Sequence, residues 1–220
     1  MPEEPSPPIG ILGGTFNPVH NAHLALAHAA LDRLGLGAVL WIPAGQPPHR
    51  AAPRVAPADR LGLVQAAIAS EPRFQLDASE VNNTAASYTV PTLERLRRQY
   101  GPTRPLVLLM GADAFLGLPG WYRWREIFDL AHIAVATRPG FPLVDFTPPL
   151  AGEFESRRLA SADFSNTSAG GIYTFELVAG TVSATEVRGL IAAHAPDAAL
   201  VPLLPPAVLD YIHQHSLYGH

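Results

Sequence analysis

The residues best suited to chemistry lie near the amino terminus, in the run 10–24, GILGGTFNPVHNAHL. An apolar strand is expected to break at Gly13 and Gly14, and a helix is expected to begin near His20. Glycines let the backbone approach a ligand closely, and the first turn of a helix presents unpaired N–H groups to an anion. Because residues three apart on a helix are neighbours, His20 and His23 face the same spot. This pattern predicts a polyphosphate-binding site.

The same run resembles the G-[GS]-[TS]-F-[DN]-P-x-[HT]-x-x-H signature of the nucleotidyltransferase superfamily. A double glycine after a strand is often only a tight turn, and a histidine pair is often structural. The resemblance therefore depends on their combination with Pro18, which restricts the loop before the helix. Ala22 stands where the family usually has glycine, and it adds a methyl group where, in the family, adenine packs against the backbone.

Residues 182–188, VSATEVR, are a second candidate for phosphate binding. Ser183 followed three residues later by Glu186 is the pattern of a capping box, which by itself only starts a helix. The segment also resembles the superfamily's second signature, I-S-[SA]-T-x-x-R. In that interpretation Arg188 lies one turn inside the helix, where its planar guanidinium binds phosphate oxygens. Because the two signatures occur in the family's order, we favour the phosphate-binding role.

Short apolar runs alternate with amphipathic helical stretches along the chain. The expected strands cover residues 9–12, 38–42, 74–78, 106–110, 132–136 and 172–177. The expected helices cover residues 20–34, 58–69 and 91–99, with one more opening at 183 and a last one from 205 or 206 to 215. Strands separated by such helices predict βαβ units, and therefore a single-domain α/β, Rossmann-like fold with a parallel sheet and helices on both faces.

Ligands of such sheets bind beyond the carboxyl ends of the strands. Polar or glycine-rich residues follow four of the expected strands, namely Gly13-Gly14-Thr15, Pro43 to Arg50, Gly111-Ala112-Asp113 and Thr137-Arg138-Pro139-Gly140. Each of these segments alone is more typical of a turn. Together they predict one site at the carboxyl edge of the sheet.

Composition excludes several other classes of protein. The net charge is −4 and all 15 basic residues are arginine, so we expect no nucleic-acid partner. The acidic, proline-rich residues 1–8 predict a disordered tail and no signal peptide, and the most apolar run, 198–209, is interrupted by prolines. We therefore expect a cytoplasmic protein with no membrane partner, one nucleotidyltransferase domain at 9–217, and an irregular surface excursion at 141–171.

Between the two signatures, further segments are similar to bacterial nicotinate-nucleotide adenylyltransferases. These segments are Ile42-Pro43 through Arg50, Ser87 to Leu93, Gly111-Ala112-Asp113, Trp121-Tyr122-Arg123-Trp124 and Arg138-Pro139-Gly140. The resemblance covers residues 9–140 and 172–217, and its specificity comes from the order and spacing of the segments.

This resemblance implies that the chain joins nicotinate mononucleotide to the AMP half of ATP and releases pyrophosphate. The implied ATP-binding residues are Gly13, Gly14, Thr15, His20, His23, Gly111, Asp113, Ser183 and Arg188, with His20, His23 and Arg188 as the catalytic set. Asp113 would accept hydrogen bonds from ribose hydroxyls. The implied mononucleotide-binding residues are Tyr88, Thr89, Trp121, Arg50 and Arg138. Mg²⁺ would be bound mainly through substrate phosphates, and we expect no metal site made by the protein alone.

Two alternatives remain at this stage. An enzyme that prefers nicotinamide mononucleotide shares the Asn17 and Asn21-x-His23 pattern, whereas Ser87-Tyr88-Thr89 and Trp121 favour the acid. A catalytically silent nucleotide-binding relative is disfavoured by the presence of both histidines and Arg188. The sequence leaves the oligomeric state open, with a homo-oligomer among the options.

Overall fold

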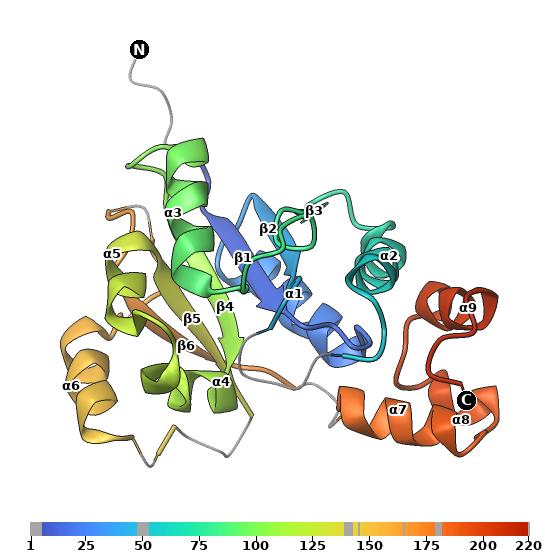
Figure 1. Cartoon of the computed structure of the whole chain (residues 1–220). Coiled ribbons are helices and arrows are strands. Elements are labelled where there is room, and N and C mark those ends of the chain that lie inside the picture. Colours follow the sequence, from blue (N-terminus) through green and yellow to red (C-terminus); the bar gives the residue numbers. More distant parts are fainter. Residues whose placement is uncertain are drawn as a thin grey trace. The chain divides into compact units, whose positions relative to one another are not determined.

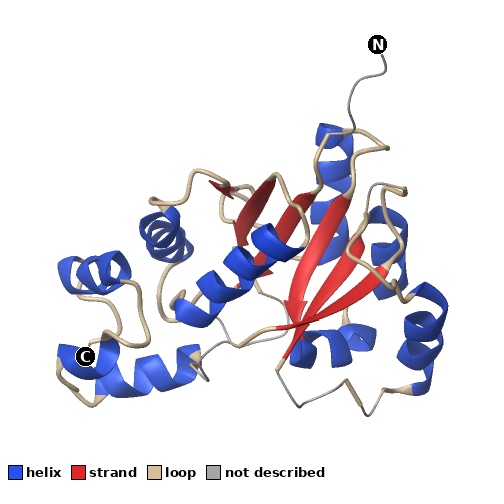
Figure 2. Ribbon diagram, turned by 180° about the vertical axis from the view of Figure 1, so that it is seen from behind, coloured by secondary structure: helices blue, strands red, loops and turns tan. Residues whose placement is uncertain are grey.

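The computed structural model describes residues 6–47, 53–138, 143–144, 146–164, 166–178 and 182–219. Its six strands form one sheet in the order β3-β2-β1-β4-β5-β6. Their bounds are β1 Ile9–Gly14, β2 Ala38–Pro43, β3 Phe74–Leu76, β4 Leu106–Gly111, β5 His132–Thr137 and β6 Ile172–Glu176. Figure 2, in which the strands are red, shows the sheet among its helices. The predicted α/β fold is confirmed, with strands close to the expected ranges.

The order of the sheet reverses between β1 and β4. These two strands pair in parallel, with Ile9 opposite Leu106 and Ile11 opposite Leu108. Parallel pairing continues from β4 to β5 and from β5 to β6. In sheets of this kind, ligands bind beyond the carboxyl ends of the two strands at the reversal. The predicted site residues Gly13 and Gly111 stand at those two strand ends.

All of the longer helices except the one at Pro148–Arg157 match the predicted pattern. Their bounds are α1 Asn21–Arg33, α2 Pro57–Ile68, α3 Thr89–Tyr100, α6 Pro148–Arg157, α7 Ala184–Ala192 and α9 Pro206–Gln214. Shorter turns are α4 Ala112–Leu116, α5 Ile127–Leu130 and α8 Asp197–Leu200, with 3-10 turns at Leu118–Gly120 and Trp124–Glu126. Within the described residues, no helix is both long and apolar enough to cross a membrane.

One helix corrects the sequence-based expectation. The stretch 141–171 was expected to be irregular, yet α6 lies within it. Proline is favourable in the first turn of a helix, where its missing N–H costs nothing, and α6 begins at Pro148. Leu150 and Phe154, four residues apart, are both buried and anchor the helix on one face. Residues 139–142, 145 and 165 lie outside the described residues.

The chain divides into two compact units. The first unit comprises Met1–Leu12, Ala27–Leu40 and Tyr88–Val178, and the second comprises Gly13–Leu26, Trp41–Ser87 and Ala179–His220. The predicted site residues are distributed over both units. The glycine turn after β1, the two histidines and the second signature belong to the second unit, whereas Gly111, Asp113 and the described mononucleotide residues belong to the first.

The first unit is built on apolar parallel strands. All residues of β4 before Gly111 are buried, as are the residues of β5 before Thr137. Arg97 of α3 ties together loops around this core, because its guanidinium donates to the carbonyls of Leu130 and Ser168 at 2.7 and 2.5 Å. Trp124 is buried in this unit. Of the expected tail at 1–8, residues 1–5 lie outside the described residues.

The second unit packs α2 beside α9 (Figure 1). The close approach depends on Gly62 of α2, because a Cβ there would lie 2.2 Å from the Tyr211 hydroxyl of α9. In β2, the ring of Trp41 contacts the rings of Phe16 and Phe74, with centroids 5.5 and 5.4 Å away. This aromatic cluster supports the loop that follows β1.

Candidate active site

β1 continues through Gly13 and Gly14, where a break was expected, and its carboxyl end leaves room for a ligand at Gly13. A Cβ built on Gly13 would meet no heavy atom of the described residues within 4 Å, whereas one on Gly14 would lie 3.1 Å from the Phe16 ring. Phe16 is buried and has a φ of 47°, a left-handed conformation that non-glycine residues rarely adopt. The buried ring therefore holds the turn in shape while the Gly13 side stays open, as a phosphate-binding turn requires.

The two histidines lie against each other at the start of α1. Their ring centroids are 3.7 Å apart, which confirms the prediction that they face one spot. The backbone N–H of His20 donates to Nδ1 of His23 at 3.2 Å. Since that nitrogen accepts, the neutral His23 ring carries its proton on Nε2 and can donate from there. Nδ1 of His20 is buried without a hydrogen-bond partner among the described residues.

Burial keeps both rings neutral. Burial lowers the pKa of His20 to about 4. Burial, and then the neighbouring His20, lower the pKa of His23 to about 3. At neutral pH each ring is therefore a hydrogen-bond donor without a fixed charge. A bound polyanion would favour the protonated, positively charged form of each ring. The histidine pair can therefore gain positive charge when negative charge increases beside it.

The second signature forms a capping box, and its arginine contacts the first signature. The Ser183 hydroxyl accepts from the N–H of Glu186 at 3.1 Å, and the Glu186 carboxylate accepts from the N–H of Ser183 at 3.4 Å, which confirms the capping box. One turn further on, Arg188 donates to the backbone carbonyl of Asn17 at 2.7 Å and to the Thr185 hydroxyl at 3.2 Å. Arg188 thus joins the second signature to the first.

Arg60 is a site residue that the sequence analysis missed. It lies on the buried face of α2 and is fully buried. Its guanidinium donates to the carbonyls of Thr15 at 2.7 Å and Gly45 at 3.0 Å, while its Nε has no partner among the described residues. Burial lowers the pKa of Arg60. A signal was present, because position 60 continues the apolar spacing of Leu63 and Val64, where a charged residue is unusual.

Aromatic residues gather at the start of α3 in the first unit. Tyr88, which precedes α3, packs against Tyr122 with ring centroids 4.7 Å apart and ring planes tilted by 39°. Trp121, which directly precedes Tyr122 in the sequence, is half-buried, and Tyr122 is 50% exposed. The structure therefore places Tyr88 against Tyr122. Tyr122 is not among the predicted site residues. Thr89 is the first residue of α3, so the local backbone N–H groups belong to a helix N-terminus.

The remaining predicted residues lie at strand ends or outside the described residues. β4 ends at Gly111, and the exposed Asp113 follows in the first turn of α4. Arg138 is exposed directly after β5. Arg50 lies outside the described residues. In the described part of the chain, no group of three or more His, Asp or Glu side chains is arranged to hold a metal ion.

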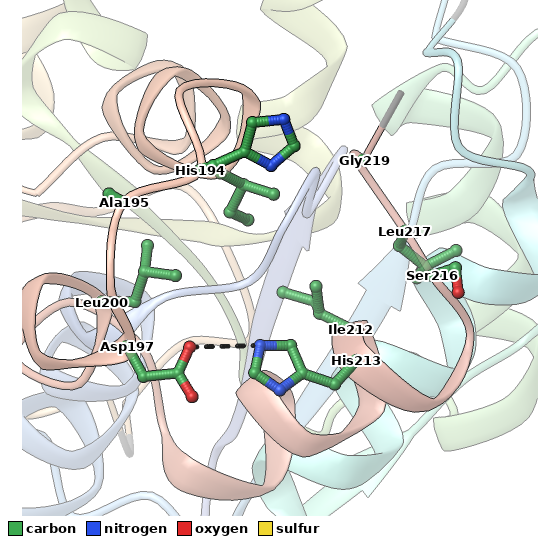
Figure 3. Close-up of a pocket in the computed structure, with 10 residues that line it drawn as sticks. His194, Ala195, Asp197, Leu200, Ile212, His213, Ser216, Leu217 and Gly219 are labelled. Atoms are coloured by element: carbon green, nitrogen blue, oxygen red, sulfur yellow. Dashed lines mark ion pairs between the residues drawn. The ribbon is translucent and has the colours of Figure 1, made fainter.

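A cavity of about 600 Å³ lies among the carboxyl-terminal helices (Figure 3). It is lined by residues of α7 to α9 and by the segment that follows α9. His213 and Asp197 point toward each other there, with Nε2 of His213 3.3 Å from Oδ1 of Asp197. None of the predicted site residues lines this cavity.

The strand order and the two joined signatures define a nucleotidyltransferase, and comparisons with known proteins refine this class. A model of the cytidylyltransferase-like family matches residues 11–190. The chain is 54% identical over 216 residues to a probable nicotinate-nucleotide adenylyltransferase of Dechloromonas aromatica, covering 97% of this chain and 98% of that protein. It is 44% identical to a protein of the same name from Laribacter hongkongensis, over 96% of this chain and 94% of that protein.

A solved structure agrees in fold. The nicotinic acid mononucleotide adenylyltransferase of Plasmodium falciparum, complexed with NaAD, superposes with a TM-score of 0.73 at 14% identity, covering 96% of this chain and 97% of that one. This chain therefore belongs to the cytidylyltransferase-like family and, within it, to the nicotinate-nucleotide adenylyltransferases.

Proposed function

We propose that the chain transfers the adenylyl group of ATP to nicotinate mononucleotide, giving nicotinate adenine dinucleotide and pyrophosphate. The observation that carries the proposal is the contact of Arg188 with Asn17, which unites the two signatures within one compact unit. The paired histidines stand three residues further along the same loop and helix. Family membership supports the same reaction, since the relatives carry its name.

In this reaction a phosphate oxygen of the mononucleotide attacks the α-phosphorus of ATP. A new P–O bond forms while the bond from the α-phosphorus to the bridging oxygen of the leaving pyrophosphate breaks. Positioning and electrostatic stabilisation are sufficient for such a step. His20 and His23 would donate hydrogen bonds to the phosphate oxygens where negative charge increases, and Arg188 with the N-terminus of α7 would bind the phosphates that leave.

The residues present fit a divalent ion that arrives with the nucleotide. Mg²⁺ is commonly bound through substrate phosphates with few protein ligands, so here it would be held mainly by the phosphates of ATP. When bound there, it would neutralise part of the phosphate charge. The protein's own contribution is the neutral histidine pair, Arg188 and the open turn at Gly13.

Residues of the first unit are the basis for proposing the acid, nicotinate mononucleotide, as the substrate. Backbone N–H groups at Tyr88 and Thr89 would donate to the pyridine carboxylate, and Trp121 would stack on the ring. Gly111 and Asp113 would bind the nucleotide, with Asp113 accepting from ribose hydroxyls. Arg138 and Arg50 would bind the mononucleotide phosphate.

The test is pyrophosphate release from ATP and Mg²⁺ with either nicotinate or nicotinamide mononucleotide, with the dinucleotide product identified by mass. An amide in place of the carboxylate loses two charge-assisted hydrogen bonds of about 1.5 to 3 kcal/mol each. We therefore expect kcat/KM to favour the acid by about two to four decades. Comparable values for the two substrates would reject the acid preference, and no release with either would reject adenylyl transfer.

A further inference from the structure

Asn17 of the first signature is held on two sides by residues from the far end of the chain. The Tyr218 hydroxyl donates to the side-chain oxygen of Asn17 at 2.9 Å. Arg188 donates to the backbone carbonyl of the same residue at 2.7 Å. Asn17 lies three residues before His20. Any shift of Asn17 would therefore move both the guanidinium of Arg188 and the start of α1.

The segment that carries Tyr218 adopts a backbone conformation that needs support. Ser216 and Tyr218 have φ values of 50° and 65°, in the left-handed region that residues with a Cβ rarely occupy. On one side, Leu217 and Gly219 line the cavity among the carboxyl-terminal helices, so this side is not closely packed (Figure 3). The Tyr218 side chain does not line that cavity and contacts Asn17 instead. Backbone hydrogen bonds from Ser216 to His213 and from Leu217 to Ile212 hold the start of the segment, and the bond to Asn17 holds the Tyr218 side chain.

The surroundings of Tyr218 keep its hydroxyl protonated. Burial raises the pKa of Tyr218, and the nearby cations Arg188 and Arg60 only partly oppose this effect. The phenol is therefore a neutral donor throughout the physiological pH range. Its two cationic neighbours are the residues that hold Asn17 and Thr15, respectively. Tyr218 therefore lies near both arginines that hold the backbone carbonyls of Asn17 and Thr15.

We propose that Tyr218 is a positioning residue for adenylyl transfer, which holds Asn17 and thereby aligns Arg188 with the paired histidines. The inference rests on the proposed function. Tyr218 itself need not touch substrate. Its effect should appear in the alignment of the reacting groups, and so in kcat more than in the KM for ATP.

The first test compares Tyr218→Phe with Tyr211→Phe in the full chain. Tyr218→Phe keeps the ring and removes the donor to Asn17, and we expect kcat to fall about tenfold or more with less than about a threefold change in KM for ATP. Tyr211 is the matched control, because its hydroxyl lies against Gly62 of α2 in the same unit and its ring stacks on His215. Tyr211→Phe should leave kcat within about twofold.

A double-mutant cycle separates positioning from general stability. Asn17→Asp keeps an acceptor for Tyr218, whereas Asn17→Ala removes it. We expect Tyr218→Phe to lower kcat when it is introduced into the unmodified chain or into Asn17→Asp, and to have no further effect when it is combined with Asn17→Ala. A loss of the same size in all three backgrounds, or a loss that merely follows the melting temperature in both tyrosine variants, would overturn the proposal.

A measurement without substrate keeps this inference separate from the proposed function. Amide hydrogen exchange over residues 15–20 should become faster in Tyr218→Phe and remain unchanged in Tyr211→Phe. If the unmodified chain releases no pyrophosphate, the proposed function fails, and the exchange result alone decides whether Tyr218 holds the loop. Unchanged exchange over this segment in Tyr218→Phe would reject the role of Tyr218 whatever the activity.

Discussion

His23 has a defined tautomer because its Nδ1 accepts from the His20 backbone N–H, and burial lowers its pKa to about 3. If its Nε2–H stabilises charge on the phosphates in the transition state, His23→Ala should lower kcat about 100-fold, or about 3 kcal/mol, with a smaller change in ATP affinity. The matched control is His28→Ala, an exposed position on the same helix. Steady-state kinetics decide the role, and near-normal turnover of His23→Ala would remove His23 from the mechanism.

Trp121 tests the assignment of the mononucleotide residues. Stacking on a pyridine ring does not distinguish a carboxylate from an amide, so Trp121→Ala should lower kcat/KM for both mononucleotides by similar factors. Trp121→Phe should retain most of the activity because it keeps an aromatic ring. The measurement is kcat/KM for each mononucleotide at fixed ATP and Mg²⁺. A loss confined to the acid would instead mean that Trp121 takes part in recognising the carboxylate.

Among the elements, α2 does more than cover the sheet, because one of its side chains holds two loops at the candidate site. Its buried Arg60 ties the turn after β1 to the loop after β2 through the carbonyls of Thr15 and Gly45. The loop after β2 is tied in turn to the segment before α3, because the N–H of Gly45 donates to the Ser87 hydroxyl at 3.0 Å. The backbone at Thr15 is therefore held by a helical residue that follows it by more than forty positions in the chain.

Arg60→Met tests this connection. The substitution keeps an unbranched side chain of similar length but leaves two backbone carbonyls without their donor. We expect the free energy of unfolding to fall by about 2 kcal/mol, measured by urea denaturation, and ATP binding to weaken in calorimetry. Stability equal to or above that of the unmodified chain would show that the cost of burying the guanidinium outweighs its hydrogen bonds.

For the whole molecule, the neutral histidines make stability depend on pH. Histidine in an unfolded chain titrates near 6.5, whereas the folded values are about 4 for His20 and about 3 for His23. Between these values the unfolded chain binds more protons than the folded chain, so the free energy of unfolding rises with pH. This contribution is complete above about pH 6.5 and is lost as the pH falls toward 4 and 3.

Urea denaturation at about pH 7 and about pH 5 checks this dependence. A variant with both His20 and His23 changed to Asn should lose less stability on acidification than the unmodified chain. His28→Asn should behave like the unmodified chain, because position 28 is exposed. Parallel curves for the double variant and the unmodified chain would mean that the histidine pair is already protonated in the folded protein at acidic pH.

The sequence by itself determined the α/β class and the approximate ranges of the strands and of the longer helices other than α6. These features are encoded over short distances, by alternation of apolar residues, by the glycine turn before His20 and by the capping box of Ser183. Helix periodicity also predicted that His20 and His23 would meet. It did not predict α6, because its two prolines and its glycine resemble loop sequence while Leu150 and Phe154 supply the burial.

Only the tertiary structure decided which distant side chains support these segments. Tyr218 reaches Asn17 across 201 positions of the chain, and Arg188 reaches the same residue across 171. The two carbonyl partners of Arg60 and the pairing of Tyr88 with Tyr122 likewise depend on the path of the chain. A local pattern specifies which face of a helix or strand is apolar. It contains no information on which polar group from elsewhere will lie opposite a buried donor, because that choice is made when the elements pack together.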